Sequence, residues 1–116
     1  MSLNKNLDIL FRSEKYFMLT SKQRAQLRKL ANTLSVTLHV GKDGVTEGVL
    51  DQLNVLLENH ELVKGKVLEN AMLTPKTVAE VLSEETGADS VQVIGTKFVL
   101  YRQSSDKDKR KIVLEK

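Results

Sequence analysis

The stretch Val40-Gly41-Lys42-Asp43-Gly44-Val45-Thr46 joins a short apolar run, residues 37–40, to a helical pattern that starts at Thr46. Glycine has no Cβ, so a Gly-x-x-Gly turn can bend sharply and bring its backbone close to another surface. Ahead of a helix, such a turn offers free N–H groups and the positive end of the helix dipole, here beside one lysine. The stretch therefore predicts a strand–loop–helix unit that binds an anion, for which a nucleic-acid phosphate is the commonest candidate.

The charges on the two sides of this loop differ in sign. Residues 18–44 contain one acid, Asp43, and five basic residues: Lys22, Arg24, Arg28, Lys29 and Lys42. Residues 45–62 contain no lysine or arginine and four acids: Glu47, Asp51, Glu58 and Glu61. Although the net charge is only +3, this polarity favours an anionic partner that approaches from the basic side.

A helix that begins at Thr20 or Ser21 is predicted before the loop, because both residues are good N-caps. Its apolar stripe repeats at helical spacing: Leu27, Leu30, Ala31 and Leu34. Lys22 and Lys29 flank that stripe on one side, and Arg24 and Arg28 flank it on the other. The helix therefore either contributes to anion binding or carries a solvated basic surface.

The rest of the chain predicts two more helices and three more strands. Helices are expected over residues 46–59 and from Thr74-Pro75 to Gly87, and strands over 61–69, 90–95 and 97–102. Gly65 is expected to mark a bulge in the first of these strands, where Lys64 and Lys66 are either solvated or extend a basic surface. The order helix, strand, helix, strand, helix, strand, strand predicts an α/β two-layer fold in which three helices cover a four-stranded sheet.

The two ends of the chain differ from the central domain in their sequence pattern. Residues 1–17 are read as an extension, either non-native or a short amphipathic helix, and residues 18–103 as one domain. Residues 104–116 form a charged tail, in which 112–114 either add a short strand or stay loose.

Several kinds of function are excluded or disfavoured by composition. Cysteine is absent, which excludes disulfides, thiolate metal sites and cysteine nucleophiles. No apolar run reaches the length of about 18 residues that a membrane span needs. With no recognisable secretory leader, a cytoplasmic protein is expected. The acids Glu80, Glu84, Glu85 and Asp89 are read as an exposed acidic surface, and no metal or cofactor is expected.

An enzyme is also disfavoured. The Walker nucleotide loop needs four residues between its glycines and then Lys-Ser/Thr, and the Gly41–Gly44 stretch meets neither condition. His39 and His60 are the only histidines, and the spacing places no nucleophile beside either of them.

The chain resembles the CRM domain (chloroplast RNA splicing and ribosome maturation), and in particular its stand-alone bacterial YhbY-type form. The resemblance spans residues 18–102 and rests on segments that occur in the same order: Leu27-Arg28, Leu30-Ala31, Val40-Gly41-Lys42, Gly44-Val45-Thr46, Glu61-Leu62-Val63-Lys64, Val91-Gln92-Val93-Ile94-Gly95 and Leu100-Tyr101-Arg102. It implies an RNA-binding module with a KH-like GxxG loop and a fold similar to the C-terminal domain of a bacterial translation initiation factor. It further implies a factor of the large ribosomal subunit precursor.

The resemblance also implies which residues contact RNA. The family's loop corresponds to Gly41, Lys42 and Gly44, with Asp43 at a variable position, and its basic helix corresponds to Lys22, Arg24, Arg28 and Lys29. The family often has a proline after that helix, where this chain has Ser35 or Val36.

The sequence thus predicts a monomer that binds structured ribosomal RNA without catalysis. Backbone N–H groups of residues 41–44 would hold a phosphate, and Asp43 would point to solvent or cap the next helix. The alternative is a protein-interaction module whose polarised surface docks an acidic partner.

Overall fold

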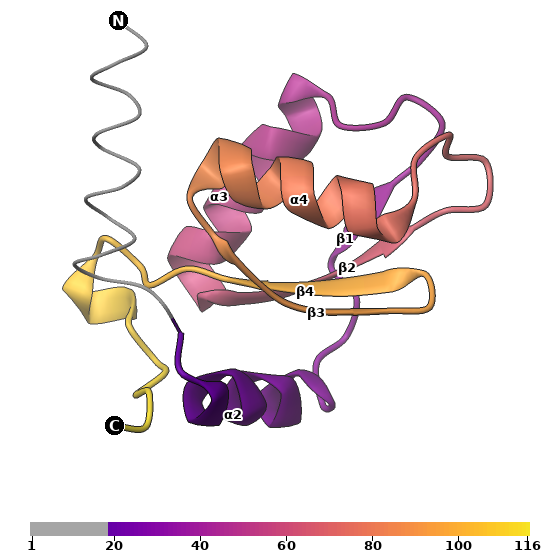
Figure 1. Ribbon diagram of the computed structural model, residues 1–116. Helices are drawn as coiled ribbons and strands as arrows, with labels where there is room; N and C mark the ends of the chain where they lie inside the picture. The colour runs from indigo at the N-terminus through magenta and orange to yellow at the C-terminus, as the bar shows by residue number, and fades with distance from the viewer. Residues whose placement is uncertain (1–18) are drawn as a thin grey trace, which may run out of the picture.

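The computed structural model describes residues 19–116, so the expected N-terminal extension of residues 1–17 lies outside the described part of the chain (Figure 1). Within residues 19–116 the elements are α2 (Ser21–Ala31), β1 (Leu38–Val40), α3 (Glu47–His60), β2 (Leu62–Val67), α4 (Pro75–Thr86), β3 (Asp89–Ile94), β4 (Lys97–Tyr101) and the 3₁₀ turn η1 (Lys107–Lys109). None of the helices in this part of the chain is long and apolar enough to cross a membrane.

The four strands form one mixed sheet in the order β1-β2-β4-β3. β1 runs parallel to β2, whereas β4 is antiparallel to both β2 and β3. The predicted α/β fold, with three helices and a four-stranded sheet, is therefore confirmed. The β3–β4 hairpin turns at Gly95, whose φ of 60° is readily reached only by glycine.

Alternating side chains along the strands divide the core into two clusters, because successive residues of a strand point to opposite faces. Val63, Val67, Phe98 and Leu100 join one cluster with side chains of α3 and α4. Leu62, Val99 and Tyr101 join the other cluster with Leu27 and Ala31 of α2.

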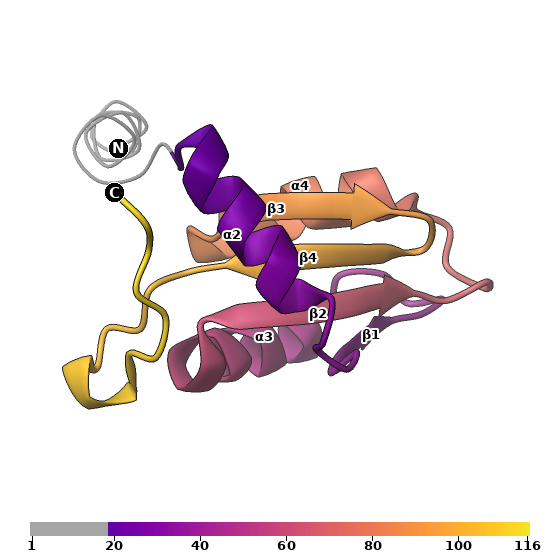
Figure 2. The same ribbon diagram turned by 90° about the horizontal axis from the view of Figure 1, so that it is seen from below.

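The helices consequently lie on both sides of the sheet. α3 and α4 cover one face, and α2 is the only helix of residues 19–116 that crosses the other face, so helices flank the sheet on both sides instead of forming the predicted two layers (Figures 1 and 2). Because α2 crosses the strands obliquely, it leaves the half of that face next to the β3–β4 turn uncovered (Figure 2).

Threonine caps α2, α3 and α4, and for α2 the cap is Thr20, one of the two residues that the sequence predicts there. Oγ1 of Thr20 accepts a hydrogen bond from the Gln23 N–H at 3.0 Å, and Thr46 and Thr74 do the same for the N–H groups of Val49 and Thr77 at 3.2 Å. Each bond satisfies a backbone donor that has no partner within its helix.

The bulge expected at Gly65 is wrong, because β2 keeps an unbroken register with both of its neighbours through this residue. Gly65 lies directly opposite Phe98, and a Cβ at Gly65 would overlap the Phe98 ring. The glycine therefore makes room for the largest aromatic side chain of that cluster. The irregularity of the sheet lies instead in β3, between Ser90 and Gln92.

Residues 104–116 fold back against α2. The region expected as a strand or loose segment at 112–114 has no regular structure, but Ile112 and Leu114 pack against the α2-side cluster. The buried carboxylate of Glu61 anchors the segment by accepting hydrogen bonds from three backbone N–H groups, those of Ser104, Lys111 and Ile112, at 2.8, 2.7 and 3.1 Å.

Candidate nucleic-acid interface

The glycine loop after β1 closes on itself as a four-residue turn. The N–H of Gly44 donates to the carbonyl of Gly41 at 3.0 Å, and Gly44 has a positive φ of 71°, which strains any other residue. Lys42 and Asp43 occupy the exposed tip. The loop thus presents one lysine and one aspartate to solvent on a short, internally bonded turn.

The donors available at this tip are fewer than the sequence predicts. The Gly44 N–H is used within the turn and the Val49 N–H is used by Thr46. Among contacts of the described residues, the N–H groups of Lys42 and Asp43 have no protein acceptor. The sequence predicts that Asp43 either caps the next helix or points to solvent. Because Thr46 caps α3, Asp43 is the residue exposed to solvent. Glu47, at the first position of α3, puts a carboxylate where an anion would otherwise meet the helix dipole.

A second loop, residues 68–74, lies against the glycine loop. The Cβ that Gly41 lacks would lie 3.6 Å from Leu68 Cδ1, and that of Gly44 would lie 3.6 Å from Leu73 Cδ1. Met72, in the same loop, is 89% exposed. This apolar support was not predicted, and its sign in the sequence is the apolar pair Met72-Leu73 directly before the Thr74-Pro75 helix start.

The four basic residues of α2 have three different surroundings. Arg24 reaches across the sheet edge and donates to the carbonyl of Ser90, so its guanidinium is held by β3. Lys22 and Lys29 are exposed, and Arg28 is half-buried beside the apolar stripe. Because α2 lies on the opposite side of the sheet from α3, these side chains and the loop that leads into α3 are not one cluster (Figure 1). The α2 side chains and the glycine loop lie beside the same sheet, but on different sides of it (Figure 1).

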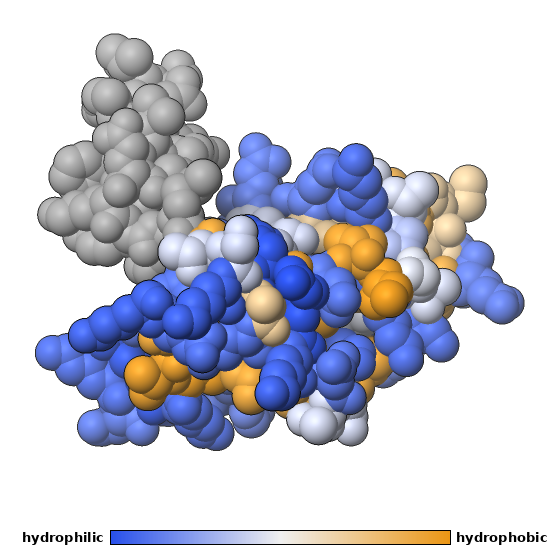
Figure 3. Space-filling view, turned by 60° about the horizontal axis from the view of Figure 1, so that its bottom comes forward, coloured by the Kyte–Doolittle hydropathy of each residue, from blue (hydrophilic) through white to orange (hydrophobic). Residues whose placement is uncertain are grey.

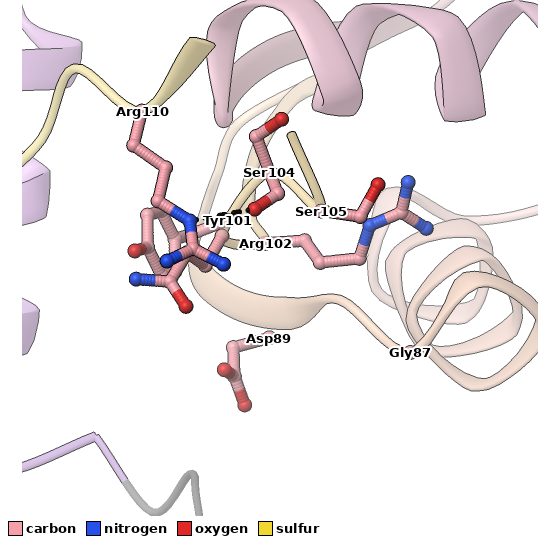
Figure 4. Close-up of a pocket in the computed structure, with 8 residues that line it drawn as sticks. Gly87, Asp89, Tyr101, Arg102, Ser104, Ser105 and Arg110 are labelled. Atoms are coloured by element: carbon pink, nitrogen blue, oxygen red, sulfur yellow. Dashed lines mark hydrogen bonds between the residues drawn. The ribbon is translucent and has the colours of Figure 1, made fainter. Parts of the chain in front are cut away.

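A polar hollow of about 210 Å³ lies at the other end of the sheet, where β4 leads into the C-terminal segment (Figure 4). Its two arginines are already used by the protein. Arg102 donates to the Asn54 side chain and the Thr86 carbonyl, both at 2.8 Å, and forms an ion pair with Glu58 at 3.1 Å. Arg110 donates to the Ser104 carbonyl at 2.9 Å. These bonds indicate a structural junction rather than a ligand site.

Three groups around this junction have shifted pKa values. The hydrogen bond from the Ser105 hydroxyl, helped by Arg102 and opposed by burial, lowers the pKa of the Glu58 carboxyl. Burial raises the pKa of Asp89, against the charge of Arg24. Burial and the Glu61 and Asp89 carboxylates raise the pKa of the Tyr101 hydroxyl to about 12, against the charge of Arg110.

The acids of α4 and of the start of β3 differ in their exposure to solvent. Glu80, Glu84 and Glu85 are exposed, as expected, whereas Asp89 is half-buried. Across residues 19–116 there is no group of three or more histidine, aspartate or glutamate side chains that could hold a metal ion.

Comparison with known proteins identifies relatives over most of the described chain. Residues 19–102 match the model of the CRS1 / YhbY (CRM) domain. A Bacillus subtilis protein named "Probable RNA-binding protein YqeI" is 39% identical over 89 residues, which cover 77% of this chain and 93% of the relative. A Haemophilus influenzae protein named "RNA-binding protein" is 39% identical over 88 residues, covering 76% and 89% of the two chains.

A solved structure agrees in both sequence and fold. The solution structure of a hypothetical Staphylococcus aureus protein, described as "a putative RNA binding protein", superimposes with a TM-score of 0.67 at 41% identity. The match covers 83% of this chain and all of the other. With the helix and strand order, the glycine loop and these matches in agreement, the chain belongs to the CRS1 / YhbY (CRM) domain family.

Proposed function

We propose that this protein binds RNA without catalysing a reaction, and that its target is the ribosomal RNA of the large-subunit precursor. It would act as a monomer in the cytoplasm, with no cofactor, membrane or small-molecule substrate. The observation that carries the proposal is the exposed Lys42 on a closed glycine turn, in a family whose relatives are named as RNA-binding proteins.

The turn would contact one phosphate of the RNA backbone. The N–H groups of Lys42 and Asp43 are turned toward no protein acceptor in the described chain, so a phosphate oxygen can accept from them. The Lys42 ammonium would add a mobile positive charge. Asp43 and Glu47 repel an anion, so they would restrict its approach to the lysine side of the tip.

The α2 residues would contact further phosphates of the same RNA. Lys22 and Lys29 are exposed and Arg28 is half-buried, so their charges are available, whereas Arg24 is held by the Ser90 carbonyl and would serve mainly to fix α2 on the sheet. Specificity would come from RNA shape and unpaired bases, because residues 19–116 offer few aromatic side chains for stacking.

Replacement of Lys42 by alanine tests the loop contact. We expect the log–log slope of RNA affinity against salt to fall by about 0.7 to 0.9, because one counterion-releasing contact is lost, with the unfolding midpoint unchanged. Fluorescence anisotropy with labelled RNA between about 50 and 200 mM salt measures the slope. Lys107→Ala is the matched control, since Lys107 is exposed in η1, at the far end of the sheet. Equal slopes in the two variants would exclude the loop contact.

The ribosomal target needs a separate experiment. Crosslinking in cells, followed by sequencing of the attached RNA, is expected to recover large-subunit ribosomal RNA. Recovery of no RNA would contradict RNA binding itself, whereas recovery of another RNA class would contradict only the target.

A second candidate function, docking of an acidic protein segment, is favoured by one hollow on the α2 side. This groove of about 420 Å³ has an apolar floor that includes Leu30, Leu34 and Leu62, and a rim that includes Lys64 and Lys111. Purified components distinguish the two functions. If the groove docks a protein, the purified protein would bind no RNA at low salt, and Lys111→Ala, at the rim of the groove, would weaken binding of the acidic protein segment.

A further inference from the structure

A row of basic side chains crosses the sheet next to the glycine loop. His39 of β1 lies opposite Lys66 of β2, and Lys66 lies opposite Lys97 of β4. Ile94 of β3 extends the row beyond Lys97. These residues come from four separate strands, so the row exists only in the folded sheet. His39 is also only two residues before Gly41, which makes the row continuous with the loop.

The row lies on the half of the α2 face that α2 does not cover. Lys66 shares a face of β2 with Leu62, which packs against α2, and Lys64 marks the border of the helix by donating to the Ala31 carbonyl at 3.3 Å. Farther toward the hairpin turn, His39 and Lys97 are exposed and Ile94 is 61% exposed. Figure 2 shows this end of the sheet open, and Figure 3 shows a largely hydrophilic surface with apolar patches on the α2 side.

The charges of the row are not neutralised by the fold. Two lysines directly opposite each other on neighbouring strands repel and destabilise the sheet. Within the described chain the only ion pair is Arg102 with Glu58, at the other end of the sheet. Asp89 is also distant, since it lies opposite Tyr101 at that far end. A sheet that places Lys66 against Lys97, with no ion pair to either lysine in residues 19–116, gains stability when a polyanion binds.

The dimensions of the row fit a nucleic-acid strand. Neighbouring strands are about 4.8 Å apart, so three strands place His39, Lys66 and Lys97 over about 10 Å. A strand of a nucleic-acid duplex carries one phosphate about every 3.4 Å along the helix axis, so a row of about 10 Å corresponds to about three such steps. Arg28 projects from the flank of α2 that faces away from the C-terminal segment, because Gln23 and Gln26 bind that segment from the other flank. Arg28 thus borders the same open surface.

We propose that this surface, formed by His39, Lys66, Ile94 and Lys97, is a second backbone-binding site for the RNA held by the Lys42 loop. The proposal rests on the proposed function and extends it, since one RNA strand would pass from the loop tip across the sheet toward α2. The two lysines bind phosphates, while His39 and Ile94 offer flat and apolar surface to a ribose or an unpaired base.

The double substitution Lys66→Gln and Lys97→Gln tests the surface, with Lys107→Gln and Lys116→Gln as a control that removes the same charge. The probe is a labelled RNA hairpin with a 12-nucleotide single-stranded tail; its sequence is arbitrary because phosphate contacts carry no sequence information. We expect the salt slope to fall by about 2, or about 1 per lysine, only in the sheet variant. Its unfolding midpoint should stay equal or rise, because the repulsion between the lysines is removed. A purely structural role would lower the midpoint.

Addition of Lys42→Ala to the sheet variant should lower the slope by about 1 more, because both sites hold one RNA. An unchanged slope in the sheet variant, together with a reduced slope in Lys42→Ala alone, overturns the second site and leaves the proposed function intact. If the unsubstituted protein does not bind the hairpin at 50 mM salt, the proposed function fails as well. Loss of an acidic protein partner in the sheet variant, with RNA affinity unchanged, assigns the surface to a protein instead.

Discussion

At the scale of single residues, Gly65 shows how one position can couple two strands. Its backbone is ordinary strand, so its selection is not explained by a positive φ. The reason is the Phe98 ring that occupies the space of a side chain. β2 is therefore unbroken at this position, which keeps Lys66 in register between His39 and Lys97.

Replacement of Gly65 by alanine is expected to destabilise the protein by about 1–3 kcal/mol, since Phe98 must move within a packed core. Urea unfolding followed by circular dichroism measures the change. Gly48→Ala is the control, because its Cβ would meet only Thr46 Oγ1, at an ordinary 3.7 Å. If both variants were equally stable, the ring would not be what requires glycine.

At Glu61, in contrast to Gly65, hydrogen bonds of the side chain stabilise an unfavourable backbone conformation. It ends α3 with a φ of 67°, which is unfavourable for a residue with a Cβ. Its carboxylate is fully buried and accepts hydrogen bonds from three backbone N–H groups of the C-terminal segment. These bonds compensate for the unfavourable φ.

At the scale of elements, the C-terminal segment behaves as part of the α2-side core. Ile112 and Leu114 pack there, and the Gln26 side chain binds the segment in both directions, donating to the Val113 carbonyl and accepting from the Glu115 N–H. α2 is thus held by the sheet on one side and by this segment on another.

Deletion of residues 104–116 should lower the free energy of unfolding by about 2–4 kcal/mol. The deletion exposes apolar surface of α2 and leaves the buried Glu61 carboxylate without its donors. Thermal and urea unfolding measure the loss, and deletion of Lys116 alone serves as the control. A truncated protein with unchanged stability would show that α2 docks on the sheet without this segment.

At the scale of the whole molecule, the sheet separates two cores with different chemistry. The α3 and α4 side is sealed by apolar residues and has acidic helices outside. The α2-side cluster has fewer buried residues, includes the Tyr101 hydroxyl near Glu61 and Asp89, and leaves basic positions of the sheet uncovered. The basic and acidic segments of the sequence therefore lie on opposite faces of one sheet.

The Tyr101 hydroxyl gives global stability a predictable dependence on pH. Its pKa is raised to about 12 in the folded protein, against about 10 in an unfolded chain. Between these values the unfolded state binds fewer protons, so stability is complete below about pH 10 and falls as the pH rises toward 12. Urea unfolding between about pH 8 and 11.5 should show a steeper loss in the unsubstituted protein than in Tyr101→Phe. All other ionisable groups are the same in both proteins, so the difference isolates Tyr101; parallel curves would contradict the prediction.

The sequence by itself determined the elements and which side of each is apolar. Helical spacing in residues 27–34, alternation in β2 and the capping threonines Thr20, Thr46 and Thr74 are local patterns, so the αβαβαββ order could be predicted from them. The glycine turn with Lys42 at its tip could be located for the same reason, since a turn depends on four consecutive residues.

Only the tertiary structure decided which of these residues are neighbours. It separated α2 from the loop, used Arg24 to bind Ser90, placed the 68–74 loop behind the glycines and aligned His39, Lys66 and Lys97 in one row. The physical reason is that strand pairing joins segments far apart in the chain, and its register depends on the packing of the whole core. No local pattern around Lys66 identifies Lys97 as its partner.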